Sequence, residues 1–176
     1  MRSISSLLSG WLFALVAFAG MAAEAPKTFK VGEFAFARPE AWEWIVSASP
    51  MRKAQLKVPA KGGKPAEVVF FYFGEGSGGG TKANVDRWLG QFEEPRDKIS
   101  AKVEEKKAGP RTITYVQAEG TYKSGMPGGP TTPQPNTMLL GAILESSQGN
   151  VFVRMTGPID VVKTAKDDFN KMIEAR

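Results

Sequence analysis

Apolar and polar side chains alternate along residues 28–39 and again along residues 52–59, and this period of two predicts half-buried strands. Within the first of these segments, Gly32 predicts a bend. Residues 42–47 begin a further strand after a turn at "PEAW". Residues 66–73 read "AEVVFFYF" and are apolar on both sides, which predicts a central strand covered on both faces.

The spacing of apolar residues changes to that of a helix in two places. After a glycine-rich loop, four apolar side chains recur at i, i+3, i+4 and i+7, namely Val85, Trp88, Leu89 and Phe92. Thr81 is the predicted N-cap of this helix, and Pro95 ends it. Pro158 suits the first turn of a second helix, whose apolar stripe is formed by Val162, Ala165, Phe169, Met172 and Ile173.

Two hairpins are predicted between the helices. One covers residues 100–122 and turns at Gly109-Pro110, and the other pairs residues 137–146 with residues 151–157. Residues 123–136 read "KSGMPGGPTTPQPN". Because this segment is rich in Pro and Gly, we expect a mobile surface loop without regular structure.

These elements predict one α+β domain over residues 23–176. Hairpin connections make its sheet mainly antiparallel. Strands that are apolar on both sides require a covering layer on each face of the sheet. We therefore expect a sandwich with helices packed on both faces, and with mobile loops at residues 74–81 and 123–136.

Three segments resemble the PsbP-like fold family. They are "FAFARPEAW" near the N-terminus, the two-sided strand before the first helix, and the ending "GNVFVRMTGPIDVVKTAKDDFNKMI". That family includes an extrinsic subunit of photosystem II and a nuclear import factor. The resemblance implies an adaptor or assembly protein more often than an enzyme, and it carries no functional residue over to this chain. A metal contact through His is not carried over either, because the chain has no His.

The N-terminal residues 1–22 have the pattern of a secretory signal peptide, with Arg2 before a short apolar stretch and small residues after it. The alternative is an uncleaved N-terminal anchor, although the apolar stretch is short for a membrane span. No Cys follows the stretch, so a lipid-modified N-terminus is excluded. We expect a periplasmic or secreted protein that keeps no stable membrane span after cleavage.

Charge and missing residue types exclude several functions. The net charge of +5 is small, and basic residues are interspersed with acidic ones, so we expect no nucleic-acid partner. The chain has no His and no Cys, which excludes a Ser-His-Asp triad, a Cys nucleophile, a Cys/His zinc site and His-ligated haem. We expect no cofactor, no metal and no catalytic residue, with enzymatic activity the less favoured reading.

The glycine-rich loop of residues 74–82 resembles a phosphate-binding loop, but the order of its last residues is wrong. A P-loop places Lys and a hydroxyl residue directly after the last Gly, whereas this loop ends Gly78, Gly79, Gly80, Thr81, Lys82. A flexible connector is one interpretation, and an anion site at the start of the helix is the other. A hydrolase that uses carboxylates or a Ser-Lys pair stays a further alternative, although adjacent acids point in different directions and form no dyad.

Five more residues are candidates for a ligand or partner surface. Trp42 and Trp44 face one side of a strand, where they are either core or the frame of a groove. Arg111, Tyr122 and Arg154 lie on predicted strands and are candidates to line a cleft. Arg154 shares the side of Phe152, and the alternative for it is a charge that protects an edge strand. The predicted function is an exported, non-enzymatic binding or assembly module whose partner is a protein of the cell envelope.

Overall fold

The structure is a computed structural model that describes residues 25–125 and 129–175. The predicted signal peptide, residues 1–22, lies outside the described residues. The elements, in chain order, are β1 (Thr28–Val31), β2 (Phe34–Ala37), β3 (Glu43–Trp44), β4 (Arg52–Val58), β5 (Ala66–Tyr72), α1 (Thr81–Leu89), β6 (Lys102–Ala108), β7 (Arg111–Gly125), β8 (Thr131–Leu144), β9 (Val151–Pro158) and α2 (Ile159–Glu174).

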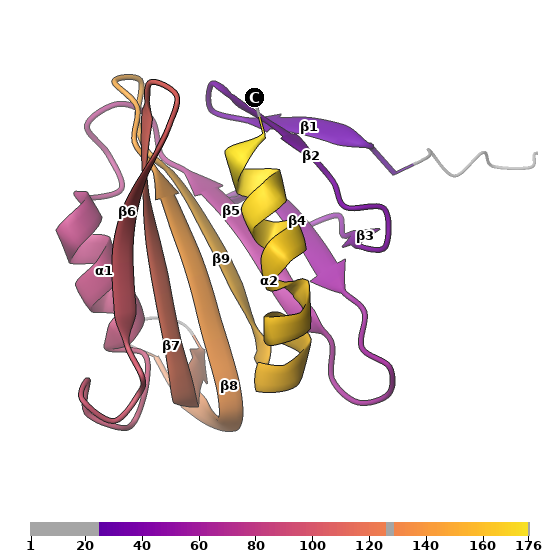
Figure 1. The fold of residues 1–176 in the computed structure, drawn as a ribbon, viewed down its shortest axis with the longest axis vertical. Coiled ribbons are helices and arrows are strands. Elements are labelled where there is room, and N and C mark those ends of the chain that lie inside the picture. Colours follow the sequence, from indigo (N-terminus) through magenta and orange to yellow (C-terminus); the bar gives the residue numbers. More distant parts are fainter. Residues whose placement is uncertain (1–24, 126–128, 176) are drawn as a thin grey trace, which may run out of the picture.

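Seven of the strands form one antiparallel sheet in the order β3-β4-β5-β9-β8-β7-β6 (Figure 1). The last strand of the chain, β9, pairs with β5 on one side and with β8 on the other. β9 thereby joins the N-terminal strands β3 to β5 to the C-terminal strands β6 to β8. The hairpin of β1 and β2 stays separate from this sheet and packs over it next to α2.

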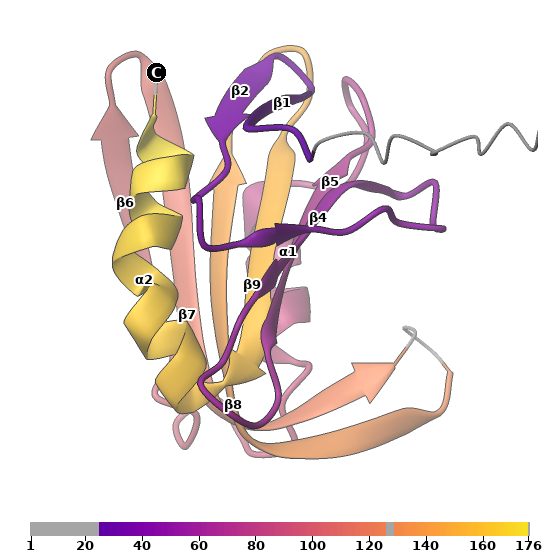
Figure 2. The ribbon, with the colours of Figure 1, turned by 90° about the vertical axis from the view of Figure 1, so that its right-hand side faces the viewer.

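The sheet buries both of its faces. Along β9, Val151, Val153 and Met155 belong to the core under α2, whereas Phe152 belongs to the core under α1. This alternation follows from the period of two, which sends successive side chains to opposite faces. Figure 2 shows α2 and the β1–β2 hairpin over one face, and the far end of the β7–β8 hairpin reaching away from α2.

The predicted sandwich with helices packed on both faces is wrong. Strands make up 47% of the chain and helices only 17%, so the fold is a large antiparallel sheet and not a sheet between helical layers. On one face, α2 shares the cover with the β1–β2 hairpin. On the other face, α1 is a single helix of 9 residues. The strands that are apolar on both sides correctly predicted that both faces of the sheet are covered. They did not predict which elements cover each face.

The prediction of a loop without regular structure over residues 123–136 is also wrong. Strand β7 continues to Gly125 and β8 begins at Thr131, with Ser124 paired to Thr132; residues 126–128 of the segment lie outside the described part. Over residues 131–136, β8 pairs with β7 alone within the described part of the chain, because its pairing with β9 begins at Thr137. Prolines are accepted on such an edge, where no second ladder needs their N–H.

Smaller differences concern the first strands and the first helix. The chain does not bend but reverses at Gly32, whose φ of 57° suits the tight turn between β1 and β2. The strand predicted from residue 42 is only two residues long. The N-cap of α1 is Gly80, so Thr81 is the first helical residue. The two predicted hairpins, β6–β7 and β8–β9, and both predicted helices are confirmed.

Candidate functional site

The best-supported site is a groove on the face of the sheet that carries α1. It has a volume of about 380 Å³ and lies between β5, β9, α1 and the start of β4. We call it the arginine groove. Its walls hold four aromatic side chains and three guanidinium groups, which are Phe71, Phe73, Trp88 and Phe152, and Arg52, Arg87 and Arg154.

The aromatic wall of the groove follows directly from strand geometry. Phe71 and Phe73 are two residues apart and point to the same side, and Phe71 is paired in register with Phe152 on β9. The ring centroids of Phe71 and Phe73 are 6.3 Å apart with nearly parallel planes, and those of Phe73 and Phe152 are 6.2 Å apart. The Phe73 side chain keeps 38% of its surface exposed, so it offers ring surface to a ligand.

Arg154 is the most unusual side chain of the groove. Its Nη1 donates a hydrogen bond of 2.7 Å to Oε1 of Gln91, and its guanidinium lies 5.9 Å from the centre of the Tyr122 ring. Its Nε is buried and has no acceptor among the described residues. Within the same part of the chain, no carboxylate lies within 4.0 Å of it. Arg154 therefore brings a positive charge into an aromatic wall without a carboxylate in direct contact.

The other two arginines of the groove differ in how their charges are compensated. Arg52 forms an ion pair of 2.7 Å with Glu67. Arg87 donates to the amide oxygen of Asn84, a neutral partner. Since only Arg52 has a carboxylate partner among the described residues, the groove keeps an excess of positive charge. An anion is the complementary ligand.

Tyr122 lies behind Arg154, and burial is the main cause that raises the pKa of its phenol. The nearby Arg154 charge acts in the opposite direction, but burial prevails. The phenol therefore stays neutral and serves as a polar, aromatic support for the guanidinium. Its ring also packs edge-on against Phe92, with centroids 5.5 Å apart.

The glycine-rich loop packs behind the groove, against its aromatic wall. A Cβ at Gly78 would lie 2.7 Å from the Phe73 ring and 2.9 Å from the Phe152 ring, so the loop packs directly on the aromatic wall. The fully buried Asn84 donates from its amide to the carbonyls of Gly78, Gly79 and Gly80. At the start of α1, the Thr81 hydroxyl donates to the Glu145 carboxylate over 2.6 Å. An anionic group of the protein itself is thus already close to the helix N-terminus.

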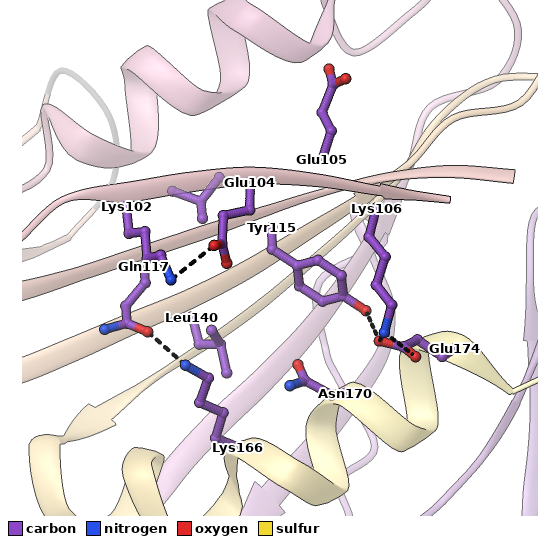
Figure 3. A pocket seen from close by; sticks show the side chains of 11 residues that line it. Lys102, Glu104, Glu105, Lys106, Tyr115, Gln117, Leu140, Lys166, Asn170 and Glu174 are labelled. Carbon is purple, nitrogen blue, oxygen red and sulfur yellow. Dashed lines mark hydrogen bonds and ion pairs between the residues drawn. The ribbon is translucent and has the colours of Figure 1, made fainter. Parts of the chain in front are cut away.

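A second groove lies on the other face, between β6, β7 and α2, and has a volume of about 550 Å³ (Figure 3). Its three lysines are balanced by three carboxylates, those of Glu104, Glu105 and Glu174. Lys102 pairs with Glu104, Lys106 pairs with Glu174, and Lys166 donates to Gln117, as the dashed lines in Figure 3 show. Because positive and negative side chains are equal in number there, this groove attracts an anion less than the arginine groove does.

Tyr115 is the one phenol in this second groove, and it donates a hydrogen bond of 3.1 Å to Glu174. Burial, together with the neighbouring Glu174 carboxylate, raises the pKa of Tyr115 well above its usual range. A phenol that holds its proton so firmly is a poor general base.

The remaining predicted residues lie apart from the arginine groove. Trp42 is buried in the core under α2, and Trp44 is half-buried against that core, with its ring centroid 5.2 Å from that of Phe29. Arg111 lies over the Phe34 ring at 5.4 Å, far along β7 from Tyr122. Lys82 is almost fully exposed and pairs with Asp86.

Of the ten residues predicted from sequence, the structure brings Gly78, Tyr122 and Arg154 together at one site. The interpretation of Arg154 as an edge-strand charge is wrong, because β9 lies between β5 and β8. Sequence reasoning missed Phe73, Arg52, Arg87 and Gln91. Only Phe73 has a usable signal, since it extends an apolar strand by one residue into a glycine-rich loop.

No protein-family model and no curated protein matches the chain. Among solved structures, a protein of unknown function from Pseudomonas aeruginosa, PA94, is similar to it with a TM-score of 0.46 and 13% sequence identity. The match covers 85% of this chain and 94% of that one. This likeness is too weak to establish a shared fold, and the resemblance to the PsbP-like family stays a prediction.

Proposed function

We propose that this chain is a non-enzymatic binding module that holds an acidic ligand in the arginine groove. The observation that carries the proposal is Arg154, whose guanidinium lies in an aromatic wall, bonded to the neutral Gln91. A partly desolvated cation without a carboxylate in direct contact is costly, and an anion that enters the groove removes part of that cost. The neighbouring Arg87 adds to the attraction.

The alternative hydrolase reading receives less support. The pKa values of three carboxyl groups are lowered, mainly by hydrogen bonds. The partner of Asp86 is Lys82, that of Glu94 is Thr121, and that of Glu104 is Lys102. A carboxylic acid that donates a proton in catalysis needs a raised pKa instead. Within the described residues, no three acidic side chains gather at one place, and no Ser hydroxyl is hydrogen-bonded to a Lys amine.

Thermal unfolding in the presence of small anions tests the proposal. Carboxylates, sulfonates and phosphates are compared with neutral alcohols of the same skeleton. A ligand that binds only the native state raises the melting temperature, and at 100 times its dissociation constant it adds about 2.7 kcal/mol of stability. We expect acids to stabilise the protein and the alcohols to have a smaller effect.

Arg154→Gln removes the charge in the groove, and Arg111→Gln is the matched control. Both arginines lie over an aromatic ring, but Arg111 is outside the groove. The stabilisation by acids is expected to disappear in Arg154→Gln and to persist in Arg111→Gln. The proposal is wrong if no acid stabilises the protein, or if acids stabilise both variants equally.

We further propose that binding takes place outside the cytoplasm, in the periplasm or after secretion, with the ligand presented in the cell envelope. The pattern of residues 1–22 is the basis for this location. Neither helix of the described residues is long and apolar enough to cross a membrane. Fusion of residues 1–30 to a reporter that is active only after export tests the location, and an inactive fusion would reject it.

A further inference from the structure

Half of the exposed large apolar side chains of the described residues lie at the arginine groove. Within the described residues, four large apolar side chains are exposed, namely Val46, Met51, Phe73 and Val103. Two of them, Met51 and Phe73, line the groove. Exposed apolar surface beside uncompensated positive charge is the mark of a site for a ligand that is itself both apolar and anionic.

The apolar part of the groove is shaped for a flat ring. The rings of Phe71 and Phe73 are nearly parallel, with an interplanar angle of 13°, so their faces are turned in the same direction. Trp88 and Phe152 extend the same wall and are themselves buried. Aromatic surfaces prefer offset stacking or edge contacts with another ring, beyond what area burial alone provides. Met51 on the rim adds a polarisable thioether, which favours contact with aromatic rings.

The polar part of the groove is shaped for a planar acid. Arg87 and Arg154 offer planar guanidinium groups, which match the geometry of a carboxylate and hold it through paired hydrogen bonds. Arg52 is already neutralised by Glu67 at 2.7 Å, so two of the three charges are left for a ligand. No lysine lines the groove among the described residues, and its other polar side chains are those of Ser49 and Gln91.

We propose that the ligand is a small aryl carboxylate, with its ring on the Phe73 face and its carboxylate on Arg154 and Arg87. This inference rests on the proposed function and narrows it from any acid to one chemical class. The groove volume of about 380 Å³ is near the lower end for ligand sites, which suits one or two fused rings.

Calorimetric titration of the purified protein with four probes tests the inference. The probes are 2-naphthoate, its neutral counterpart 2-naphthalenemethanol, octanoate as a flexible acid without a ring, and 2-naphthyl phosphate. We expect 2-naphthoate to bind at least about tenfold more tightly than the alcohol, because a hydrogen bond to a charged group is lost in the alcohol. Binding roughly three- to tenfold tighter than octanoate is expected from the ring contacts.

The variant Phe73→Leu separates the ring contact from mere apolar area. It keeps an apolar side chain of similar size but removes the exposed π face. We expect roughly a three- to tenfold loss of affinity for 2-naphthoate and little change for octanoate. Val46→Ala, which removes an exposed apolar side chain outside the groove, is the control and is expected to bind both acids like the natural protein.

The outcomes separate the two proposals. Octanoate binding as tightly as 2-naphthoate would overturn the aryl class and leave an acid-binding groove. Tighter binding of 2-naphthyl phosphate would overturn the carboxylate and leave the aromatic ligand. If none of the acids binds, both proposals fail. Equal losses for both acids in Phe73→Leu, with an unchanged circular dichroism spectrum, would also overturn the ring contact.

Discussion

At the scale of single residues, Asn84 shows how a short helix fixes a glycine-rich loop. Its side chain is fully buried and donates to three successive loop carbonyls, while its oxygen accepts from Arg87. One amide therefore organises both the loop behind the arginine groove and one guanidinium on its rim. The helical spacing of residues 81–92 does not indicate this role, because Asn84 cannot be told apart from the other polar residues outside the apolar stripe.

Replacing Asn84 by Ala is expected to lower the free energy of unfolding by about 1–3 kcal/mol. The variant removes a fully buried amide together with its hydrogen bonds to the loop and to Arg87, and each such bond contributes about 0.5–1.5 kcal/mol. Urea unfolding followed by circular dichroism measures the difference. Lys82→Ala, at a side chain that is 90% exposed, is the control and is expected to stay within about 0.5 kcal/mol. A similar effect of both substitutions would contradict the role of Asn84.

Gly78 and Gly76 form a matched pair for testing whether the loop really packs on the aromatic wall. Both have positive φ, 83° and 66°, so Ala strains the backbone at either site by about 1 kcal/mol. A Cβ at Gly76 meets no atom within 4 Å, whereas one at Gly78 would lie 2.7 Å from Phe73.

Gly78→Ala is therefore expected to destabilise the protein by about 1–3 kcal/mol more than Gly76→Ala, because it adds overpacking to the backbone strain. Melting temperatures of the two variants, measured side by side, give the comparison. Gly78→Ala should also weaken binding in the arginine groove, since the Phe73 ring must move. Equal melting temperatures would show that the loop does not rest on the rings.

At the scale of elements, the segment after α1 connects the helix to the long hairpin of β7 and β8. The N–H of Glu93 donates to the carbonyl of Thr121, and the N–H of Lys123 donates to the carbonyl of Gln91. Both carboxylate oxygens of Glu94 accept from the Thr121 N–H at 2.9 Å, next to the irregular register between Gly120 and Tyr122. These bonds hold the hairpin where Tyr122 supports Arg154.

Hydrogen bonding with Thr121 lowers the pKa of Glu94 from its ordinary value of 4.5. A carboxyl group whose pKa is lowered by folding stabilises the folded state above its unfolded pKa, and it loses that contribution as the pH falls through the folded pKa. Glu94→Gln is therefore expected to lower the melting temperature at pH 7. The difference from the natural protein should shrink as the pH is lowered below 4.5.

Melting curves of both proteins between pH 7 and pH 2.5 measure the effect. Glu93→Gln removes the exposed neighbouring carboxylate and serves as the control, which is expected to melt like the natural protein at pH 7. A melting-temperature difference for Glu94→Gln that stays constant over this range would mean that the charge of Glu94 has no part in holding the hairpin.

The elements also show how far a sequence pattern can be followed. Periods of two and 3.6 predicted β4, β5, both helices and two hairpins, because these elements bury a regular stripe. The same reasoning failed for residues 123–136, where pairing at a sheet edge outweighs the prolines. The arginine groove could not be predicted from sequence, because Arg154 and Gln91 are 63 residues apart and no local pattern indicates their contact.

At the scale of the whole molecule, the two cores share one sheet. Side chains of β8 alternate between them, with Leu140 and Ala142 under α2 and Leu139 and Ile143 under α1. Both cores are built on the same strands. Loss of packing on one face therefore destabilises strands on which the other core also depends. We therefore expect the two faces to unfold as one cooperative unit, as single domains of this size usually do.

Ile173→Val on α2 and Ile143→Val on β8 test this expectation from opposite faces. Each removes one methylene from a fully buried side chain and should cost about 0.5–1.5 kcal/mol. If the faces unfold together, each variant lowers the protection of backbone amides in α1 and α2 by the same amount when hydrogen exchange is followed in increasing urea. If Ile173→Val instead leaves the amides of α1 unchanged, the face with the arginine groove unfolds independently. Ligand binding there would then protect α1 and the groove strands but not α2, which the same exchange experiment with 2-naphthoate would detect.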